Sequence, residues 1–376
     1  MQKKLRFTGK DQMLFFPILK KRVDAYFTEN NLSKNANAEM VFKSFFFGGG
    51  VISLYCLIMF GGFSPWVMLG LAVLLGMFKA FVGFNISHDA IHGSYTSNKR
   101  VNEVIGRIAF NTLGGNDSVW RTTHNLVHHT YTNIPGHDED IDVAPGLVRL
   151  SVVEELKPMM RFQHLYAIPL YGLAYISWIF RKDYVKFFQD KIGQTKNKYT
   201  KTDKFNLFFF KALYYTLFIV LPLVFLPITW WQFIIGFVAM GVAGGLVLGL
   251  VFQLAHVVEG TEFPEPNEEN EIEEVWAIHQ MQTTANFARK SWLACFLCGG
   301  LNMQVEHHLF PQVCHVHYPK IASIVKETAE EFGVPYVEHK TFFNAIVSHY
   351  KTLKKLGKGA LEELKDDNQQ QQAQAA

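Results

Sequence analysis

Three clusters of histidine residues have the spacing that metal binding requires. In the first two clusters, pairs of histidines lie four residues apart, so on a helix both members of a pair face the same side. Adjacent histidines occur in the second and third clusters, point roughly 100° apart on a helix, and suit two neighbouring ions better than one. The sequence therefore predicts a two-metal centre built from His88 and His92; His124, His128 and His129; and His307 and His308.

The ligand type narrows the choice of metal without settling it. A single histidine is more often a surface or packed residue than a ligand, but three clusters with this spacing favour a metal site. Imidazoles without a thiolate framework suit iron, copper or zinc. Hydrolytic zinc sites need few ligands, so the number of histidines fits two redox metals better. Cys295 and Cys298 form a lone C-x-x-C in an apolar run, and we interpret them as packing residues.

Carboxylates near the clusters are candidates to accept hydrogen bonds from the second ring nitrogen of metal-bound histidines. Asp89 and Glu306 lie inside the first and third clusters, and Glu259 follows His256 closely. Taken singly, a carboxylate in such a place is often an ordinary surface residue. Three further candidates follow the second cluster: Asp138, Asp140 and Asp142.

The composition indicates a membrane protein. The chain has 376 residues, of which only 18% are charged and 49% are hydrophobic, including 34 phenylalanines. A net charge of +3 is too small to indicate a nucleic-acid partner. The basic N-terminal segment is not followed by a short cleavable apolar core, so we expect no signal peptide.

Two long stretches without charge, 44–78 and 212–254, are each broken once by turn-forming residues. Each half approaches the ~20 apolar residues that cross a bilayer as a helix. We therefore predict an all-α integral membrane protein with four transmembrane helices in two hairpins, near 42–61, 65–85, 206–226 and 231–254. The second helix should extend into His88, and the fourth should end at His256.

Topology decides the role of the segment 162–180, which is long enough to span but contains Pro169 and Gly172. If it crossed the membrane, the second and third histidine clusters would lie on opposite faces and could not share a site. We expect it to be an interfacial helix. Both connecting loops lack Lys and Arg, so the positive-inside rule makes the histidine face, with both termini, cytoplasmic.

The remaining segments complete the domain plan. We expect a cytoplasmic N-terminal segment at 1–40, the main membrane domain at 41–350, and a polar, disordered tail at 351–376 that ends in a glutamine-rich run. Helices should occur around 272–298 and 319–333. Together with the metal site they would form a cytoplasmic helical cap.

The clusters resemble the three histidine boxes of the membrane fatty acid desaturases, H-x(3,4)-H, H-x(2,3)-H-H and [HQ]-x(2,3)-H-H. The third begins with Gln304 and is followed by Leu309-Phe310-Pro311, which resembles the front-end subgroup. The runs Trp276–Gln280 and Thr283–Phe287 resemble bacterial members of that subgroup. The resemblance covers roughly residues 40–350.

This resemblance implies a di-iron centre that uses dioxygen and two electrons to place a cis double bond in an acyl chain, carried by acyl-CoA or a membrane lipid. The box histidines would be ligands, with His256 as an additional ligand and Gln304 as a weak one. His279, His315 and His317 lie outside the boxes and would support ligands or lie at the surface. No His-Pro-Gly-Gly motif of a fused cytochrome domain occurs. Electrons would then come from a separate ferredoxin-like carrier and its reductase.

Three other functions use similar residues. A related di-iron lipid hydroxylase or monooxygenase would share the boxes, although the glutamine-type third box argues against it. A zinc membrane hydrolase would bind zinc instead of iron. A metal transporter would place ligands at mid-membrane depth, whereas here the histidines follow the ends of the predicted spans.

Overall fold

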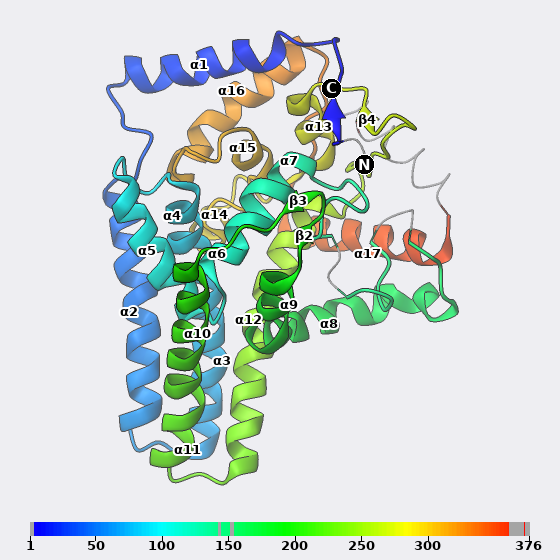
Figure 1. Cartoon of the computed structure of the whole chain (residues 1–376). Coiled ribbons are helices and arrows are strands. Elements are labelled where there is room, and N and C mark those ends of the chain that lie inside the picture. Colours follow the sequence, from blue (N-terminus) through cyan, green and yellow to red (C-terminus); the bar gives the residue numbers. More distant parts are fainter. Residues whose placement is uncertain (1–3, 142–143, 151–153, 361–371, 373–376) are drawn as a thin grey trace.

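Most of the described chain is helical, and Figure 1 separates its helices into two regions. The computed structural model describes residues 4–141, 144–150, 154–360 and 372. Long helices run side by side in the lower part of Figure 1, and shorter elements cover their upper ends. Near the N-terminus, the strand β1 (Arg6–Phe7) pairs in parallel with β4 (Glu271–Ile272). Near the C-terminus, Gln372 donates a hydrogen bond to the carbonyl of Gly260.

Within the described residues, four continuous helical runs are long and apolar enough to cross a membrane. They confirm the four predicted apolar helices. The second run continues beyond its apolar stretch to His92, so it carries the first histidine cluster as expected. The runs are α2 (Ala38–Phe60); α3 (Pro65–Val82) with η1 (Gly83–Ser87) and α4 (His88–His92); α10 (Lys201–Tyr215) with η5 (Thr216–Val220) and α11 (Leu221–Phe225); and α12 (Trp230–His256).

Local sequence explains where these helices begin. The Asn37 side chain accepts a hydrogen bond from the backbone N–H of Met40 and caps α2. Pro65 occupies the first turn of α3, where its missing N–H has no helical partner to lose. At α12, the side chain of Gln232 accepts hydrogen bonds from Thr229 in a capping box.

A further helix, α8 (Gln163–Ser177), crosses α12 instead of running along it (Figure 1). Glycines permit the crossing, because a Cβ at Gly245 would collide with the carbonyl oxygen of Gly172. The chain enters α8 through η3 (Pro158–Phe162) and leaves through η4 (Trp178–Lys182) and α9 (Asp183–Phe188). The expectation that 162–180 is an interfacial helix stays a prediction.

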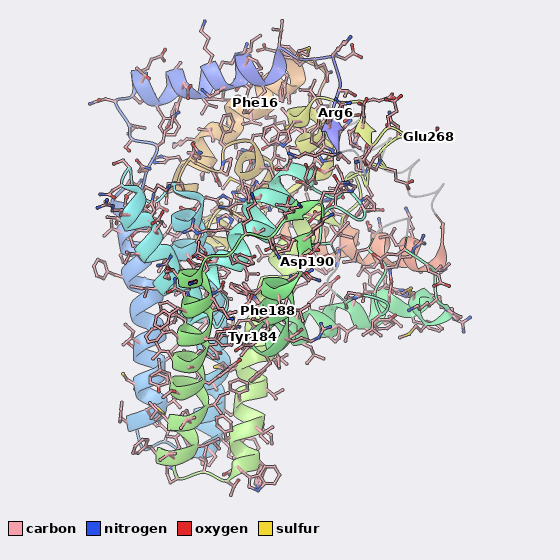
Figure 2. The ribbon with its side chains drawn as sticks, in the orientation of Figure 1. Arg6, Phe16, Tyr184, Phe188, Asp190 and Glu268 are labelled. Carbon is pink, nitrogen blue, oxygen red and sulfur yellow. The ribbon has the colours of Figure 1, made fainter. Side chains whose placement is uncertain are left out.

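The cap consists of short helices and two-residue strands. At its outer edge, α1 (Phe15–Glu29), which carries Phe16 (Figure 2), packs on α16 (Tyr318–Glu331). The rings of Phe16 and Trp276 have their centroids 5.6 Å apart. The cap's other helices are α5 (Lys99–Thr112), α6 (Asp117–Trp120), η2 (Arg121–His128), α7 (His129–Tyr131), α13 (Trp276–Thr283), α14 (Trp292–Cys298), α15 (Gln304–Leu309), η6 (His315–His317) and α17 (Phe342–Lys358). Its other strand pairs are β2 (Lys191–Ile192) with β3 (Thr195–Lys196), antiparallel, and β5 (Asn286–Phe287) with β6 (Glu338–His339), parallel.

One prediction for this part of the chain needs correction. The helical segments expected around 272–298 are α13 and α14, and between them lies β5, which pairs with β6 from a distant part of the chain. Residues 351–358, expected in a disordered tail, belong to α17, where Leu353 and Leu356 are fully buried. The helix expected at 319–333 is confirmed as α16. Of the glutamine-rich end, residues 361–371 and 373–376 lie outside the described residues.

Candidate metal centre

Five elements bring the predicted histidines to one end of the bundle. The first cluster lies on α4, the second on η2 and α7, and the third on α15, while His256 ends α12. A π-helical turn, η1, precedes the first cluster, and the second lies largely within the π-helical η2. Such turns are frequent at functional sites, since they change the direction of a side chain without ending the helix.

The ring nitrogens form overlapping groups in which all potential ligand atoms lie within 4.8 Å of one another. His307 and His308 belong to two groups each and connect them, and both are fully buried. Two neighbouring sets of imidazoles are the arrangement expected for two ions. The groups are His88, His92, His124 and His307; His128, His256 and His308; and His129, His307 and His308.

The unpartnered atoms of this cluster fit metal ions. The Nε2 atoms of His92, His128 and His307 are buried without a hydrogen-bond partner, as is Oε1 of Gln304. A buried polar atom without a partner costs roughly 1–3 kcal/mol, so several in one cluster call for a common partner. Gln304 Nε2 lies 3.0 Å from His256 Nε2, which places its amide at the edge of the second group.

Hydrogen bonds on the outer side of the rings fix their orientation. Asp138 accepts from Nδ1 of His128 at 2.9 Å, and Gln280 accepts from Nδ1 of His308 at 2.7 Å. These bonds leave each Nε2 directed at the centre, the arrangement that metal-bound histidines normally have. Three other rings make weaker Nδ1 contacts, each of 3.3 Å. Nδ1 of His124 contacts Asp140, Nδ1 of His256 contacts the Thr283 carbonyl, and Nδ1 of His307 contacts the Tyr318 hydroxyl.

Gln280 is a functional residue that spacing did not reveal. It lies 28 residues before His308, and only the folding of α13 against α15 brings the two together. The run from Trp276 to Gln280 resembles the family in sequence, but the resemblance predicts no role for the Gln280 amide.

The structure places the other predicted carboxylates differently. Glu259 faces the ammonium groups of Lys351 and Lys355, so its expected role beside a ligand is wrong. Glu306 accepts from Asn286 and Tyr336, both at 2.8 Å, and not from a ligand. Asp142 lies outside the described residues.

Asp89 joins a buried chain of polar groups beside the first cluster. Its carboxylate accepts from Nδ1 of His315 at 2.8 Å and lies 3.8 Å from Nδ1 of His88. On the other side, the Lys43 ammonium donates to Nε2 of His315 at 2.7 Å. Burial and this ammonium lower the pKa of His315 to about 4, so its ring is neutral and its Nδ1–H is available to Asp89. Asp89 therefore supports the edge of the site next to His88.

Two histidines outside the clusters lie further from the centre. His279 is buried on α13 against the ring of Phe7, with centroids 5.0 Å apart. His317 hydrogen-bonds the Asn35 carbonyl at 2.9 Å. Both side chains are buried and neither lies at the surface, while a role for them in supporting ligands stays a prediction.

Burial keeps most of the ligand rings neutral. Burial and the neighbouring imidazoles lower the pKa of His124, His129, His307 and His308 well below the ordinary value. Burial also opposes a charge on His128, but the Asp138 carboxylate outweighs it and raises the pKa of that ring. Neutral imidazole is the form that binds metal ions, so the cluster is prepared for ligation at neutral pH.

An apolar cavity of about 210 Å³ lies beside the first cluster, between η1 and α12 on one side and α5, α6, α8 and η4 on the other. His88 and Trp120 line it beside the candidate metal centre, and Gly245 lines it within α12. Lys182, Asp140 and Thr123 also line it and add polar groups. A cavity with apolar walls and a few polar groups suits a long hydrocarbon chain that carries a polar head.

Comparisons with known proteins agree with this arrangement. Residues 64–340 match the family model described as fatty acid desaturase. The chain is 37% identical to the acyl-lipid (8-3)-desaturase of Physcomitrium patens, over 94% of this chain and 74% of the relative. It is also 37% identical to the sn-1 linoleoyl-lipid 6-desaturase of Synechocystis sp., over 95% of this chain and 99% of the relative. A protein with the same description from Arthrospira platensis is 37% identical over 90% of this chain and 91% of the relative.

The substitution Asp138→Asn should weaken metal binding, because it removes the charged acceptor that orients His128. Outer partners of this kind typically contribute roughly 10- to 100-fold in metal affinity. Elemental analysis of the purified protein after dialysis against a graded chelator series should show the loss. The matched control is Glu259→Gln, which neutralises a buried carboxylate near His256 in sequence but facing lysines. Equal metal retention in Asp138→Asn and the unchanged protein would contradict the assigned role.

Proposed function

Because the chain belongs to the fatty acid desaturase family, we propose that it inserts a cis double bond into the acyl chain of a membrane lipid. The observation that carries this proposal is the convergence of the histidine clusters beside an apolar cavity between α12 and the shorter helices around it. Relatives named as acyl-lipid desaturases favour a lipid-bound acyl chain over acyl-CoA. These relatives and the glutamine-type third cluster support front-end regiochemistry, in which the bond position is measured from the carboxyl end.

We propose that the centre holds two irons. The unpartnered Nε2 atoms of His92, His128 and His307 support two adjacent ions. When bound, the irons would supply the dioxygen activation and electron storage that removal of two methylene hydrogens needs. Elemental analysis of the active protein distinguishes this proposal from a zinc hydrolase. Full activity in a protein that contains only zinc would exclude a role for iron. The proposed ligands are His88, His92, His124, His128, His129, His256, His307 and His308, with Gln304 at the edge of the set.

The chain's own residues contribute positioning. The apolar walls of the cavity keep water away from the acyl chain. Because the walls also hold the chain in one position, they decide which methylene lies at the centre and reacts. Lys182 lines the cavity with its ammonium 3.9 Å from Asp140, so a cation is available there for a polar head group. The buried rings and their outer hydrogen bonds keep the ligand atoms in place while the substrate binds.

We propose that the four helices form two transmembrane hairpins whose histidine end faces the cytoplasm. The connections at 61–64 and 226–229 contain no Lys or Arg, whereas the histidine end is rich in both. Tyr184 and Phe188 of α9 lie beside α10 (Figure 2), and Phe188 is 59% exposed. An exposed aromatic ring next to basic residues suits the membrane interface.

A separate electron carrier would dock on the basic surface formed by β2, β3 and the adjoining ends of η4 and α10. The strand β2 contacts η2, which carries His124 and His128, so this surface lies close to the centre. Its positive charge suits an acidic carrier such as a ferredoxin. The exposed basic residues are Arg181, Lys191, Lys196, Lys198, Lys201 and Lys204.

Expression in a host with defined fatty acids should produce new double bonds at a constant distance from the carboxyl carbon. Mass spectrometry of the lipids, with substrates lengthened at the methyl end, measures this position. His308→Ala should give no product while still inserting into membranes, because it alters the centre and leaves the four long helices unchanged. A bond at constant distance from the methyl end would contradict front-end regiochemistry.

The double substitution Lys196→Glu and Lys198→Glu should raise the KM for an acidic carrier by roughly 30-fold, given about 1 kcal/mol in water for each of the two close charge pairs that are lost. Steady-state turnover at increasing salt provides the measurement, and the unchanged protein should slow as salt screens the attraction. Lys21→Glu on the distant α1 is the matched control. Full turnover of the purified protein with a nicotinamide cofactor alone would disprove the need for a carrier.

Tags inserted after Gly62 and after Ile228 should be accessible from the outer side of the membrane, because both connections join apolar helices at the end away from the histidines. A tag within 185–200 should be accessible only from the cytoplasm. Protease protection in sealed vesicles reports both. An outer-side signal from 185–200 would mean that the segment 162–180 crosses the membrane.

A further inference from the structure

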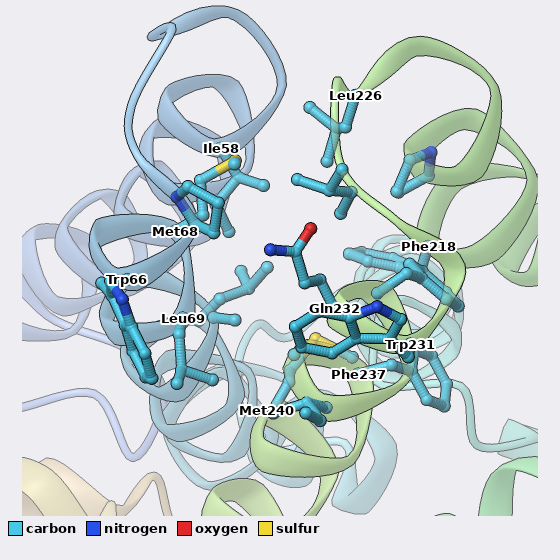
Figure 3. A pocket seen from close by; sticks show the side chains of 18 of the residues that line it. Ile58, Trp66, Met68, Leu69, Phe218, Leu226, Trp231, Gln232, Phe237 and Met240 are labelled. Carbon is cyan, nitrogen blue, oxygen red and sulfur yellow. The ribbon is translucent and has the colours of Figure 1, made fainter.

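A second apolar cavity, of about 330 Å³, lies at the end of the bundle away from the histidines. Its walls come from α2 and α3 on one side and from η5, α11 and α12 on the other. Figure 3 shows Ile58 and Leu69 of the first group across the space from Phe218 of the second. No residue that the structure describes lines both this cavity and the one beside His88, so the two are separate sites.

The lining of this cavity suits a hydrocarbon occupant better than water. Among the described residues that line it, none is charged, and the amide of Gln232 is the main polar group. A buried water needs about two to four polar partners, and these walls offer few. The volume falls within the roughly 300–1,000 Å³ of ordinary ligand sites. A hydrocarbon occupant would also supply the dispersion contacts that side chains around an empty space lose.

The depth of the cavity matches one leaflet of a bilayer. Its lining runs from Trp66 to Leu75 along α3 and from Trp231 to Met240 along α12, which is roughly 14 Å in each helix. Half of a hydrocarbon core that is ~30 Å thick has nearly the same depth. Trp66 and Trp231 at the rim are 82% and 49% exposed, as aromatic rings at a membrane interface commonly are. An acyl chain of that leaflet would therefore fill the cavity along its length.

Gln232 presents a hydrogen-bond donor to the cavity near this rim. It is the third residue of α12, and its side chain points into the space (Figure 3). Its Oε1 accepts hydrogen bonds from the backbone N–H and the hydroxyl of Thr229, at 2.8 and 3.0 Å. Because the helix cap occupies the amide oxygen, the Nε2 donor is the atom left to bind an occupant.

We propose that this cavity binds an acyl chain of a glycerolipid in the leaflet away from the histidines, and that Nε2 of Gln232 donates to an ester carbonyl of that lipid. The chain lies between the two groups of helices and joins them at the end that the cap does not cover (Figure 1). The connections at 61–64 and 226–229 contain no charged residue, so the site does not select a head group by charge. The site is independent of the proposed desaturase function.

Gly236→Phe should fill the cavity and exclude the lipid. Gly236 lines the cavity, and a Cβ at this position would meet open space, so the ring can enter without moving the backbone. Native mass spectrometry of the purified unchanged protein should show a bound glycerolipid. After the lipid is stripped in detergent, adding dioleoyl phosphatidylcholine should raise Tm, because a ligand of the folded state stabilises it. Gly236→Phe should lose both responses. Gly70→Phe on α3 is the matched control, since a Cβ there also meets open space but Gly70 does not line the cavity.

Gln232→Glu tests the hydrogen bond and keeps the helix cap. A glutamate can still accept from Thr229 in a capping box, but it has no Nε2 donor. The phosphatidylcholine concentration for half of the Tm rise should increase roughly fivefold, as expected for the loss of a typical hydrogen bond. This variant carries the test if Gly236→Phe does not accumulate. Dioleoyl phosphatidylglycerol should act like phosphatidylcholine. An equal response of either variant and the unchanged protein, a rise with phosphatidylglycerol alone, or a retained molecule that is not a glycerolipid would overturn the inference.

Discussion

The burial of many imidazole rings at one end of an apolar bundle is the constraint on which the rest of this structure depends. Each buried ring nitrogen needs a partner, and the rings cannot supply partners for one another without leaving some nitrogens unmatched. The fold meets this need on the outer side with Asp138, Gln280 and backbone carbonyls. The inner nitrogens, among them Nε2 of His92, His128 and His307, remain available to metal ions.

The long helices and the spacing of the clustered histidines were predictable because both depend on local sequence. Stretches of more than thirty residues without charge define the helices, and a spacing of four residues places two rings on one face. Even the extension of the second helix to His92 followed from the position of the first cluster directly after an apolar run. The hydrogen-bond partners of each ring were harder to predict, because they come from distant segments of the chain.

Glu306 and Glu259 show why nearness in sequence misled. Glu306 is next to His307, but successive residues on a helix point roughly 100° apart, and its carboxylate faces Asn286 and Tyr336 instead of the centre. Glu259 lies beyond the end of α12, where α17 supplies Lys351 as a partner. The last turns of α17, residues 351–358, were missed because they look polar in sequence, although one face of the helix packs against α8. Pairings across the cap, such as β5 with β6, divide a segment that local propensity alone would make one helix.

The helical run that carries the first histidine cluster also lines the cavity beside it, through Gly83, Phe84 and His88. Gly83 and His88 are five residues apart on this continuous run, so their separation along its axis is roughly 7 Å and cannot change without bending it. The π-helical turn η1, which begins at Gly83, changes the direction of His88 while the helix stays unbroken. In the proposed function, an acyl chain in this cavity, with its polar head near Lys182, is therefore held against a rigid element beside the centre. On this view the bundle is more than a membrane anchor, since its helices hold the acyl chain at the depth where a chosen methylene meets the metal centre.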